Sequence, residues 1–264
     1  EISTRDWSSD VCSSDLALWK YLSQGSKASI PEGLQRNQIV LTPEDKPILY
    51  RNFLEGLSAR GIAVGYPGGL NIAWDAETMN LAKLWQGQFI DASMHWRDRG
   101  VGRQKPLGDL VLNYESRPAV ALLSEPNAPW PDPNNSSLKY KFLGYKLDRG
   151  GVPTFRYQVG SSTVSDRSEL SLGANDSPGL KRTLRVESPD RPKEGSLWFR
   201  LADGAQITPD GKNTWRVDDR YQVTIPESLA ASVSLRDSAG KKELLLPIPP
   251  SGENASELTY FLRW

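Results

Sequence analysis

The sequence predicts a mainly β fold, a large antiparallel β-sandwich with very little helix. Apolar residues alternate with polar or small residues in many short segments, which is the period-two pattern of half-buried strands. The 264 residues include 22 glycines and 19 prolines, and this content is typical of short strands joined by tight turns. The spacing of the strands is too uneven to favour a closed barrel, so a sandwich is the expected architecture.

Two hairpins are the clearest predicted elements. In Arg60–Trp74, alternating apolar residues flank Pro67-Gly68-Gly69, where proline presets φ and glycine accepts a positive φ. In Tyr140–Val159, alternating aromatic residues flank Arg149-Gly150-Gly151. Further strands are expected at 39–41, 48–53, 79–85, 89–92, 111–114, 120–123, 162–172, 180–187, 196–201, 214–217, 221–225, 232–237, 243–248 and 258–264, whereas 93–107, 126–137 and 203–213 are expected to be loops or turns.

The first residues of the chain are not expected to belong to the fold. Glu1–Leu16 resembles the translation of a sequencing adapter, and we treat 1–16 as an artefact. The adapter-like segment contains Cys12, the only cysteine, so the rest of the chain offers no disulfide. Residues 17–36 are expected to be a short helical piece, Ala17–Leu22, followed by a linker, and 37–264 the β-sandwich domain.

Charge and hydropathy exclude several classes of function. Lysine plus arginine and aspartate plus glutamate both number 32, so no charge excess favours nucleic acid as a partner. No apolar run approaches the roughly 20 residues that a membrane span needs. We therefore expect neither a nucleic-acid partner nor a membrane span.

Candidate chemistry lies in the segment that follows the first strands. His95, the only histidine, has Asp91 four residues before it and Asp98 three residues after it, so a general base is conceivable there. A hydrogen-bonded loop histidine is the commoner arrangement. One histidine and one cysteine cannot form a typical zinc site, and we expect no metal. Arg97 and Arg99 suit a carboxylate or a protein partner, although such a run is usually a solvated loop.

The tryptophans are candidates for ligand contact. Trp74 and Trp85 fall on predicted strands and are expected in the core. Trp96 and Trp130 have polar neighbours, and we expect them at the surface, where flat aromatic faces can stack on sugar rings. The ligand-binding residues predicted from the sequence are therefore Asp91, His95, Trp96, Arg97, Asp98, Arg99 and Trp130. No catalytic residue is assigned.

Several phrases of the sequence resemble a known family. GIAVGYPGG at 61–69, AWDAE at 73–77, the W-x-G-x-F-x-D-A pattern at Trp85–Ala92 and FLGYKLDRGGVPTFRY at 142–157 are similar to the C-terminal region of large secreted c-type cytochromes of planctomycete and verrucomicrobial bacteria. The resemblance implies a periplasmic or secreted protein with a haem c domain upstream, and Ala17–Leu22 would be the tail of the last helix of that missing domain. This sequence contains no CxxCH, so covalent haem attachment is not expected on this chain.

The expected function is that of a non-catalytic accessory module of such a cytochrome. It would dock a carbohydrate-related substrate or a redox partner near the upstream haem domain, and the sandwich could be of the mutarotase-type supersandwich form. The alternative is a carbohydrate-active enzyme, a hydrolase, lyase or epimerase, with carboxylates in a cleft near Asp91–Arg99. A purely structural β domain is the third hypothesis.

Overall fold

The computed structural model describes residues 38–96, 100–131, 139–173, 177–188, 195–249 and 255–264. Two one-turn helices and nineteen strands occur in these ranges, and every strand pair is antiparallel. The predicted mainly β sandwich with little helix is therefore confirmed. The predicted adapter segment 1–16, the segment 17–36, and Arg97, Asp98 and Arg99 lie outside the described residues.

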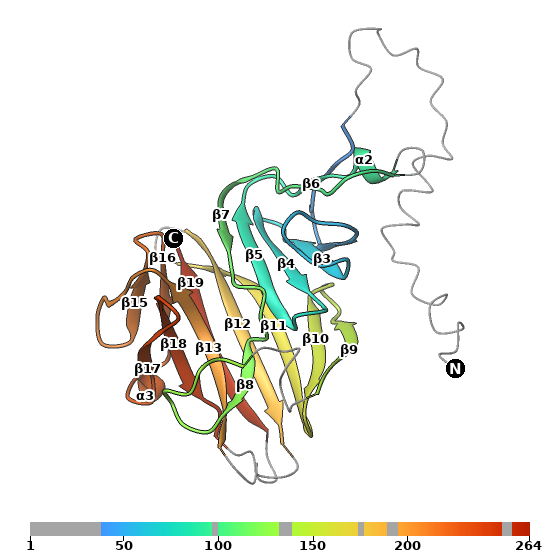
Figure 1. Ribbon diagram of the computed structural model, residues 1–264. Coiled ribbons are helices and arrows are strands. Elements are labelled where there is room, and N and C mark those ends of the chain that lie inside the picture. Colours follow the sequence, from blue (N-terminus) through green and yellow to red (C-terminus); the bar gives the residue numbers. More distant parts are fainter. Residues whose placement is uncertain (1–37, 97–99, 132–138, 174–176, 189–194, 250–254) are drawn as a thin grey trace, which may run out of the picture.

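An eight-stranded sheet forms one layer of the sandwich (Figure 1). Its order is β14 (Ile207–Pro209), β15 (Thr214–Val217), β16 (Tyr221–Thr224), β19 (Ser256–Arg263), β12 (Pro178–Glu187), β11 (Ser162–Leu172), β10 (Pro153–Val159) and β9 (Tyr140–Leu147). Burial alternates strictly along β10 and through most of β11, β12 and β19. One face of this sheet is therefore inside and the other faces solvent.

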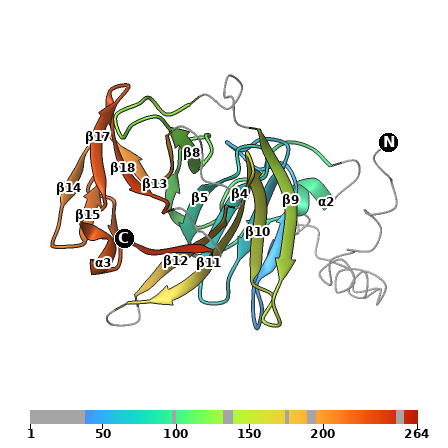
Figure 2. The ribbon, with the colours of Figure 1, turned by 90° about the horizontal axis from the view of Figure 1, so that it is seen from below.

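Two smaller sheets cover the inner face of the large sheet side by side, as Figures 1 and 2 show. The first has the order β2 (Ile48–Arg51), β3 (Gly61–Gly65), β4 (Leu70–Asp75), β5 (Asn80–Gln86) and β7 (Asp109–Asn113). The second has the order β17 (Ser234–Ser238), β18 (Lys241–Pro247), β13 (Ser196–Gly204) and β8 (Val120–Leu123). A short pair, β1 (Val40–Leu41) with β6 (Ile90–Asp91), and the helices α2 (Ser93–Trp96) and α3 (Glu227–Ala230) complete the fold.

Aromatic contacts join the layers. Trp74 on β4 stacks on Phe155 of β10 with ring centroids 4.5 Å apart, and Phe199 on β13 lies 5.5 Å from Tyr260 of β19. The predicted burial of Trp74 and Trp85 is confirmed. Every residue of β3 and β4 is buried. The alternation of large and small residues along these strands therefore does not mark a solvent-exposed face.

The outer face of the five-stranded sheet is covered by irregular chain. Tyr50, Leu54 and Phe89 pack there with Trp85 in a second hydrophobic cluster. This covering places β6 and α2 at the end of the sheet, beyond β5 in Figure 1. It therefore positions the segment from which the predicted site residues come.

The structure differs from the sequence predictions in two short elements. Residues 93–107, expected to be loop, begin with α2, and residues 203–213, expected to be a turn, contain β14. Both elements are short enough to depend on neighbours: Asp91 accepts a hydrogen bond from the Ser93 N–H at the start of α2, and β14 pairs with β15. The two predicted hairpins are confirmed, and Gly68, Gly69 and Gly151 have positive φ as their turns require.

Candidate functional site

Asp91 organises the start of the candidate site. Its Oδ1 accepts hydrogen bonds from the backbone N–H of Ser93 (2.9 Å) and of Ile39 (3.1 Å). The carbonyl of Ala92 then accepts bonds from the N–H groups of His95 and Trp96, both at 3.0 Å. The Asp91 carboxylate therefore fixes α2 and the strand β1 in one arrangement.

His95 is held by both of its ring nitrogens. Nε2 lies 3.1 Å from the carbonyl oxygen of Gly102, which can only accept, so Nε2 carries the proton. In the neutral imidazole with this tautomer, Nδ1 accepts from the hydroxyl of Tyr50, at 2.6 Å. Burial raises the pKa of Tyr50 well above its usual range, so this hydroxyl remains a donor at all ordinary pH values.

Four aromatic rings meet at this point. The rings of Tyr50 and His95 are parallel with centroids 6.0 Å apart, and Trp96 lies 5.9 Å from Tyr50. Phe53 approaches His95 edge-on at 6.3 Å. Tyr50 is buried and Trp96 is partly buried against the second hydrophobic cluster, whereas the Phe53 side chain is 48% exposed. The cluster thus has a fixed base and one ring at the surface.

An exposed apolar surface surrounds His95, and we call Phe53, Met94 and Val101 the α2 patch. Met94 is 46% exposed and Val101 is 66% exposed. The three are linked through the backbone and through His95: the Val101 N–H donates to the Met94 carbonyl at 2.9 Å, and Phe53 contacts the ring of His95, the residue that follows Met94. The other large exposed apolar side chains in the described ranges are single leucines on strands, at Leu110, Leu143, Leu147, Leu172 and Leu235.

Among the predicted site residues, the structure brings Asp91, His95 and Trp96 together. Trp130 is elsewhere, and its predicted exposure is wrong, because only 4% of it is accessible. Its indole Nε1 donates to the Pro118 carbonyl at 3.0 Å, and its ring packs with Trp198 in a third hydrophobic cluster. Residues 126–131 lie over the outer face of the four-stranded sheet, and the polar sequence around Trp130 does not indicate this burial.

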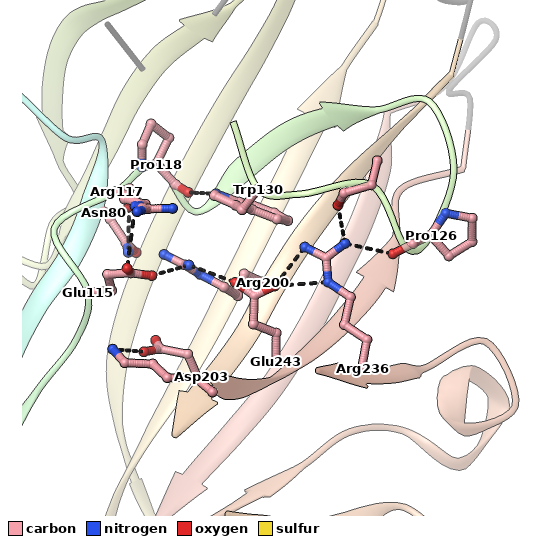
Figure 3. Close-up of polar contacts among 12 residues, drawn as sticks. Asn80, Glu115, Arg117, Pro118, Pro126, Trp130, Arg200, Asp203, Arg236 and Glu243 are labelled. Carbon is pink, nitrogen blue, oxygen red and sulfur yellow. Dashed lines mark hydrogen bonds and ion pairs between the residues drawn. The ribbon is translucent and has the colours of Figure 1, made fainter. Parts of the chain in front are cut away.

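The same face carries a buried charge network that the sequence did not indicate (Figure 3). The carboxylate of Glu243 accepts from Arg200 at 3.1 Å and from two nitrogens of Arg236 at 2.9 and 2.6 Å. Arg236 also donates to the carbonyls of Pro126 (2.8 Å) and Ala128. The network therefore ties the loop that carries Trp130 to the sheet.

Two further carboxylates lie at one side of this network. Glu115 accepts from Arg200, whose second terminal nitrogen, Nη2, has no partner among the described residues. Burial raises the pKa of Asp203, an effect that Arg200 opposes and Glu115 reinforces, while Lys241 lies 3.5 Å away. These residues come from distant parts of the chain, so no local motif could have signalled them. Their chemistry is that of a largely buried ion cluster.

Metal-binding clusters are absent from the described ranges. No group of three or more histidine, cysteine, aspartate or glutamate side chains there is arranged to hold a metal ion. A shallow depression of about 190 Å³ on the outer face of the five-stranded sheet is lined by Lys83, Gln104, Trp85 and neighbours. This volume includes open solvent and is below the roughly 300 Å³ at which small-molecule pockets begin. No helix in these ranges is long and apolar enough to cross a membrane.

Comparison with known proteins gives one family match. Residues 72–166 match the family model of a domain of unknown function, DUF6797. The matched range runs from β4 to β11 and includes α2, Met94, Val101 and Trp130, but not Phe53. No curated protein and no solved structure matches the chain. The family match names neither a cytochrome nor a bacterial group, and it shows similarity to this domain over that range.

Proposed function

We propose that this chain is a non-catalytic binding module, and that the α2 patch docks a carbohydrate-related ligand. The observation that carries the proposal is the half-exposed Phe53 ring, seated edge-on against His95 and flanked by Met94 and Val101. An exposed aromatic ring can stack on the apolar face of a sugar ring. Isolated apolar side chains on a surface need no explanation, whereas exposed apolar side chains gathered near one ring cluster suit an interaction site.

The rigidity of the platform supports binding. His95 is fixed by Tyr50 and Gly102, and the Tyr50 ring is itself buried. The side chains beneath Phe53 are therefore already ordered, and ligand binding costs them little conformational entropy. Less ordering of side chains on binding leaves more of the contact energy as affinity.

The rival hypothesis of a carboxylate-based enzyme near Asp91–Arg99 has less support from the described residues. Asp91 already accepts two backbone hydrogen bonds, and both nitrogens of His95 are engaged. A general base needs a lone pair that can reach the substrate. These hydrogen bonds are those of structural supports, and they support the binding proposal more than proton transfer.

The biological setting belongs to the proposal as well. From the resemblance to secreted c-type cytochromes, we propose a periplasmic or secreted location and a haem c domain upstream of this module. A redox partner is then the second candidate for the patch, because methionine is common at protein interfaces. The binding experiment below tests the carbohydrate ligand.

Glycan-array binding tests the proposal. The unchanged chain should bind a subset of glycans, and Phe53→Ala should weaken that binding about tenfold or more, which corresponds to about 1.4 kcal/mol. Trp96→Ala should also weaken it by loosening Tyr50 beneath the patch. The control is Leu235→Ala, which removes an exposed apolar residue on β17, far from α2 in Figure 1. A blank array, or binding that survives Phe53→Ala, would contradict the carbohydrate proposal.

A further inference from the structure

The β9–β10 hairpin concentrates positive charge in a chain that is neutral as a whole. Residues 139–159 contain one acidic residue, Asp148, and five basic residues: Lys139, Lys141, Lys146, Arg149 and Arg156. The hairpin therefore has a net charge of +4, and the rest of the chain sums to −4, because the total is zero. This asymmetry favours a negatively charged partner for this part of the molecule.

The cations of the hairpin are not neutralised by other described residues. Asp148, the one carboxylate of the hairpin, is paired with Arg167 of β11 at 2.6 Å. None of the five basic side chains forms an ion pair with a described residue. Lys141 and Lys146 are exposed, and Arg156 is partly exposed. Their charges are therefore available to a partner.

The strand register places three of these cations on one face. Along β10, Thr154, Arg156 and Gln158 alternate with buried residues, so they point away from the core. On β9, Lys146 is opposite Thr154 and Lys141 is opposite Gln158. β9 is the last strand of the eight-stranded sheet (Figure 1). These five side chains therefore lie at one edge of the outer surface of the sheet, and we call them the basic face.

Arg156 has small neighbours on both adjacent strands. It is opposite Gly144 on β9 and Ser165 on β11. Gly144 has a φ of +104°, and a Cβ atom built there would meet nothing within 4 Å. Gly144 therefore has no side chain to cover Arg156, and the space where one would lie is open. A guanidinium group can bind both oxygens of a carboxylate, so this opening suits a carboxylate ligand.

The side chains between the cations are neutral and polar. Thr154 and Gln158 flank Arg156 on β10, and on β11 Thr163 and Ser165 continue the two rows. Hydroxyl and amide groups both donate and accept hydrogen bonds, as sugar hydroxyls do. Among the described outward positions of β9, β10 and β11 there is no aromatic side chain, on which the bases of a single-stranded nucleic acid would stack. This chemistry favours an acidic polysaccharide.

We propose that the basic face binds a polyuronate, a polysaccharide whose sugars carry carboxylates. Arg156 holds one carboxylate, Lys141 and Lys146 attract its neighbours, and the polar side chains bind sugar hydroxyls. Because neutral side chains separate the cations, the face matches a carboxylate polymer better than the denser charge of a polysulfated chain. The inference goes beyond the proposed function, since this second surface shares no residue with the α2 patch.

Biolayer interferometry with immobilised polygalacturonate tests the inference on the full chain. The unchanged chain should bind, and binding should weaken with added salt because the charges are exposed. Arg156→Gln should weaken binding about tenfold, as expected for loss of charge-assisted hydrogen bonds. Lys141→Gln/Lys146→Gln should also weaken it and reduce its salt dependence. Methyl-esterified polygalacturonate, which has the same sugars without the charges, should not bind.

The matched control is Arg216→Gln. Arg216 is a similarly exposed arginine on β15, near the opposite edge of the same sheet, and it is paired with Asp210. This variant should bind polygalacturonate as the unchanged chain does, and all variants should keep their melting temperature. The inference would be overturned by absence of binding, by binding that survives Arg156→Gln, or by an equal loss in Arg216→Gln. Tighter binding of dextran sulfate or duplex DNA at the same salt concentration would overturn the polyuronate assignment.

The same variants separate this inference from the proposed function. Phe53→Ala should leave polygalacturonate binding unchanged, because Phe53 does not belong to the basic face. Polygalacturonate binding that is lost in Phe53→Ala but kept in Arg156→Gln would refute the basic face alone. Glycan-array binding that is lost in Arg156→Gln but kept in Phe53→Ala would refute the α2 patch alone.

Discussion

Asp203 and Glu243 face each other across β13 and β18 but have different surroundings. Glu243 is enclosed by the guanidinium groups of Arg200 and Arg236, which supply the hydrogen bonds that a buried carboxylate needs. Asp203 is mostly buried with a single ion-pair contact, to Lys241 at 3.5 Å. Burial therefore disfavours its charged form and raises its pKa.

This difference predicts a pH-dependent effect of Asp203→Asn. Above both its unfolded and its folded pKa, ionised Asp203 makes the folded state less stable than a neutral group would, because its folded pKa is the higher of the two. We expect Asp203→Asn to stabilise the protein in urea unfolding at pH 7. The gain should disappear below about pH 3.9, where the carboxyl is protonated in both states. A variant that is less stable at pH 7 would contradict the prediction.

At the level of strands, a β-bulge in β13 determines where the charged residues of the buried network lie. The register of β13 against β18 shifts between Arg200 and Ala202, so one extra residue is accommodated on β13. This bulge lets Arg200 and Asp203, three residues apart, both lie on the outer face with Glu243. Without it, strict alternation would direct one of the two toward the hydrophobic core.

A second irregular position lies where β5 meets the chain that enters β7. A Cβ atom on Gly108 would lie 1.7 Å from the carbonyl oxygen of Gln86, so only glycine allows this approach. We expect Gly108→Ala to destabilise the protein by about 1–3 kcal/mol in urea unfolding, as overpacking does. Gly150→Ala, in the β9–β10 turn, would meet only the side chain of Asp148 and should change stability by less than about 0.5 kcal/mol.

At the scale of the whole molecule, one buried ion pair joins the layers. Arg182 on β12 donates to both carboxylate oxygens of Asp166 on β11, at 2.9 and 2.6 Å, and the two side chains are 3% and 1% exposed. The indole of Trp74 on β4 donates to the same carboxylate at 3.0 Å, and Arg182 reaches Asn80 on β5. The pair therefore links the eight-stranded sheet to the five-stranded sheet.

Removing one partner of this pair should be costly. Asp166→Ala leaves the Arg182 charge buried without a counter-ion, and we expect a loss of about 3–5 kcal/mol in urea unfolding. Replacing both residues, Asp166→Leu with Arg182→Met, should recover most of that loss. The control is Glu187→Ala, which breaks the exposed Arg185–Glu187 pair and should cost less than about 1 kcal/mol. A single and a double variant of equal stability would contradict the argument.

The features that could be predicted from the sequence are the local ones. Glycine and proline at the turns of the Arg60–Trp74 and Tyr140–Val159 hairpins restrict φ locally, and the alternation beside them needs no distant partner to be recognised. The burial of Trp74 and Trp85 followed from their place on such strands. The candidate site was located in part, because Asp91, His95 and Trp96 are neighbours in the chain.

Only the tertiary structure decided the rest. Phe53 reaches the ring of His95, 42 residues away in the chain, only through the tertiary packing, and Trp130 is buried because residues from the four-stranded sheet pack against it. Glu115 and Arg200 are 85 residues apart and meet through the packing of β8 on β13. Exposure depends on which distant segment covers a side chain, and the local pattern of residues does not contain that information.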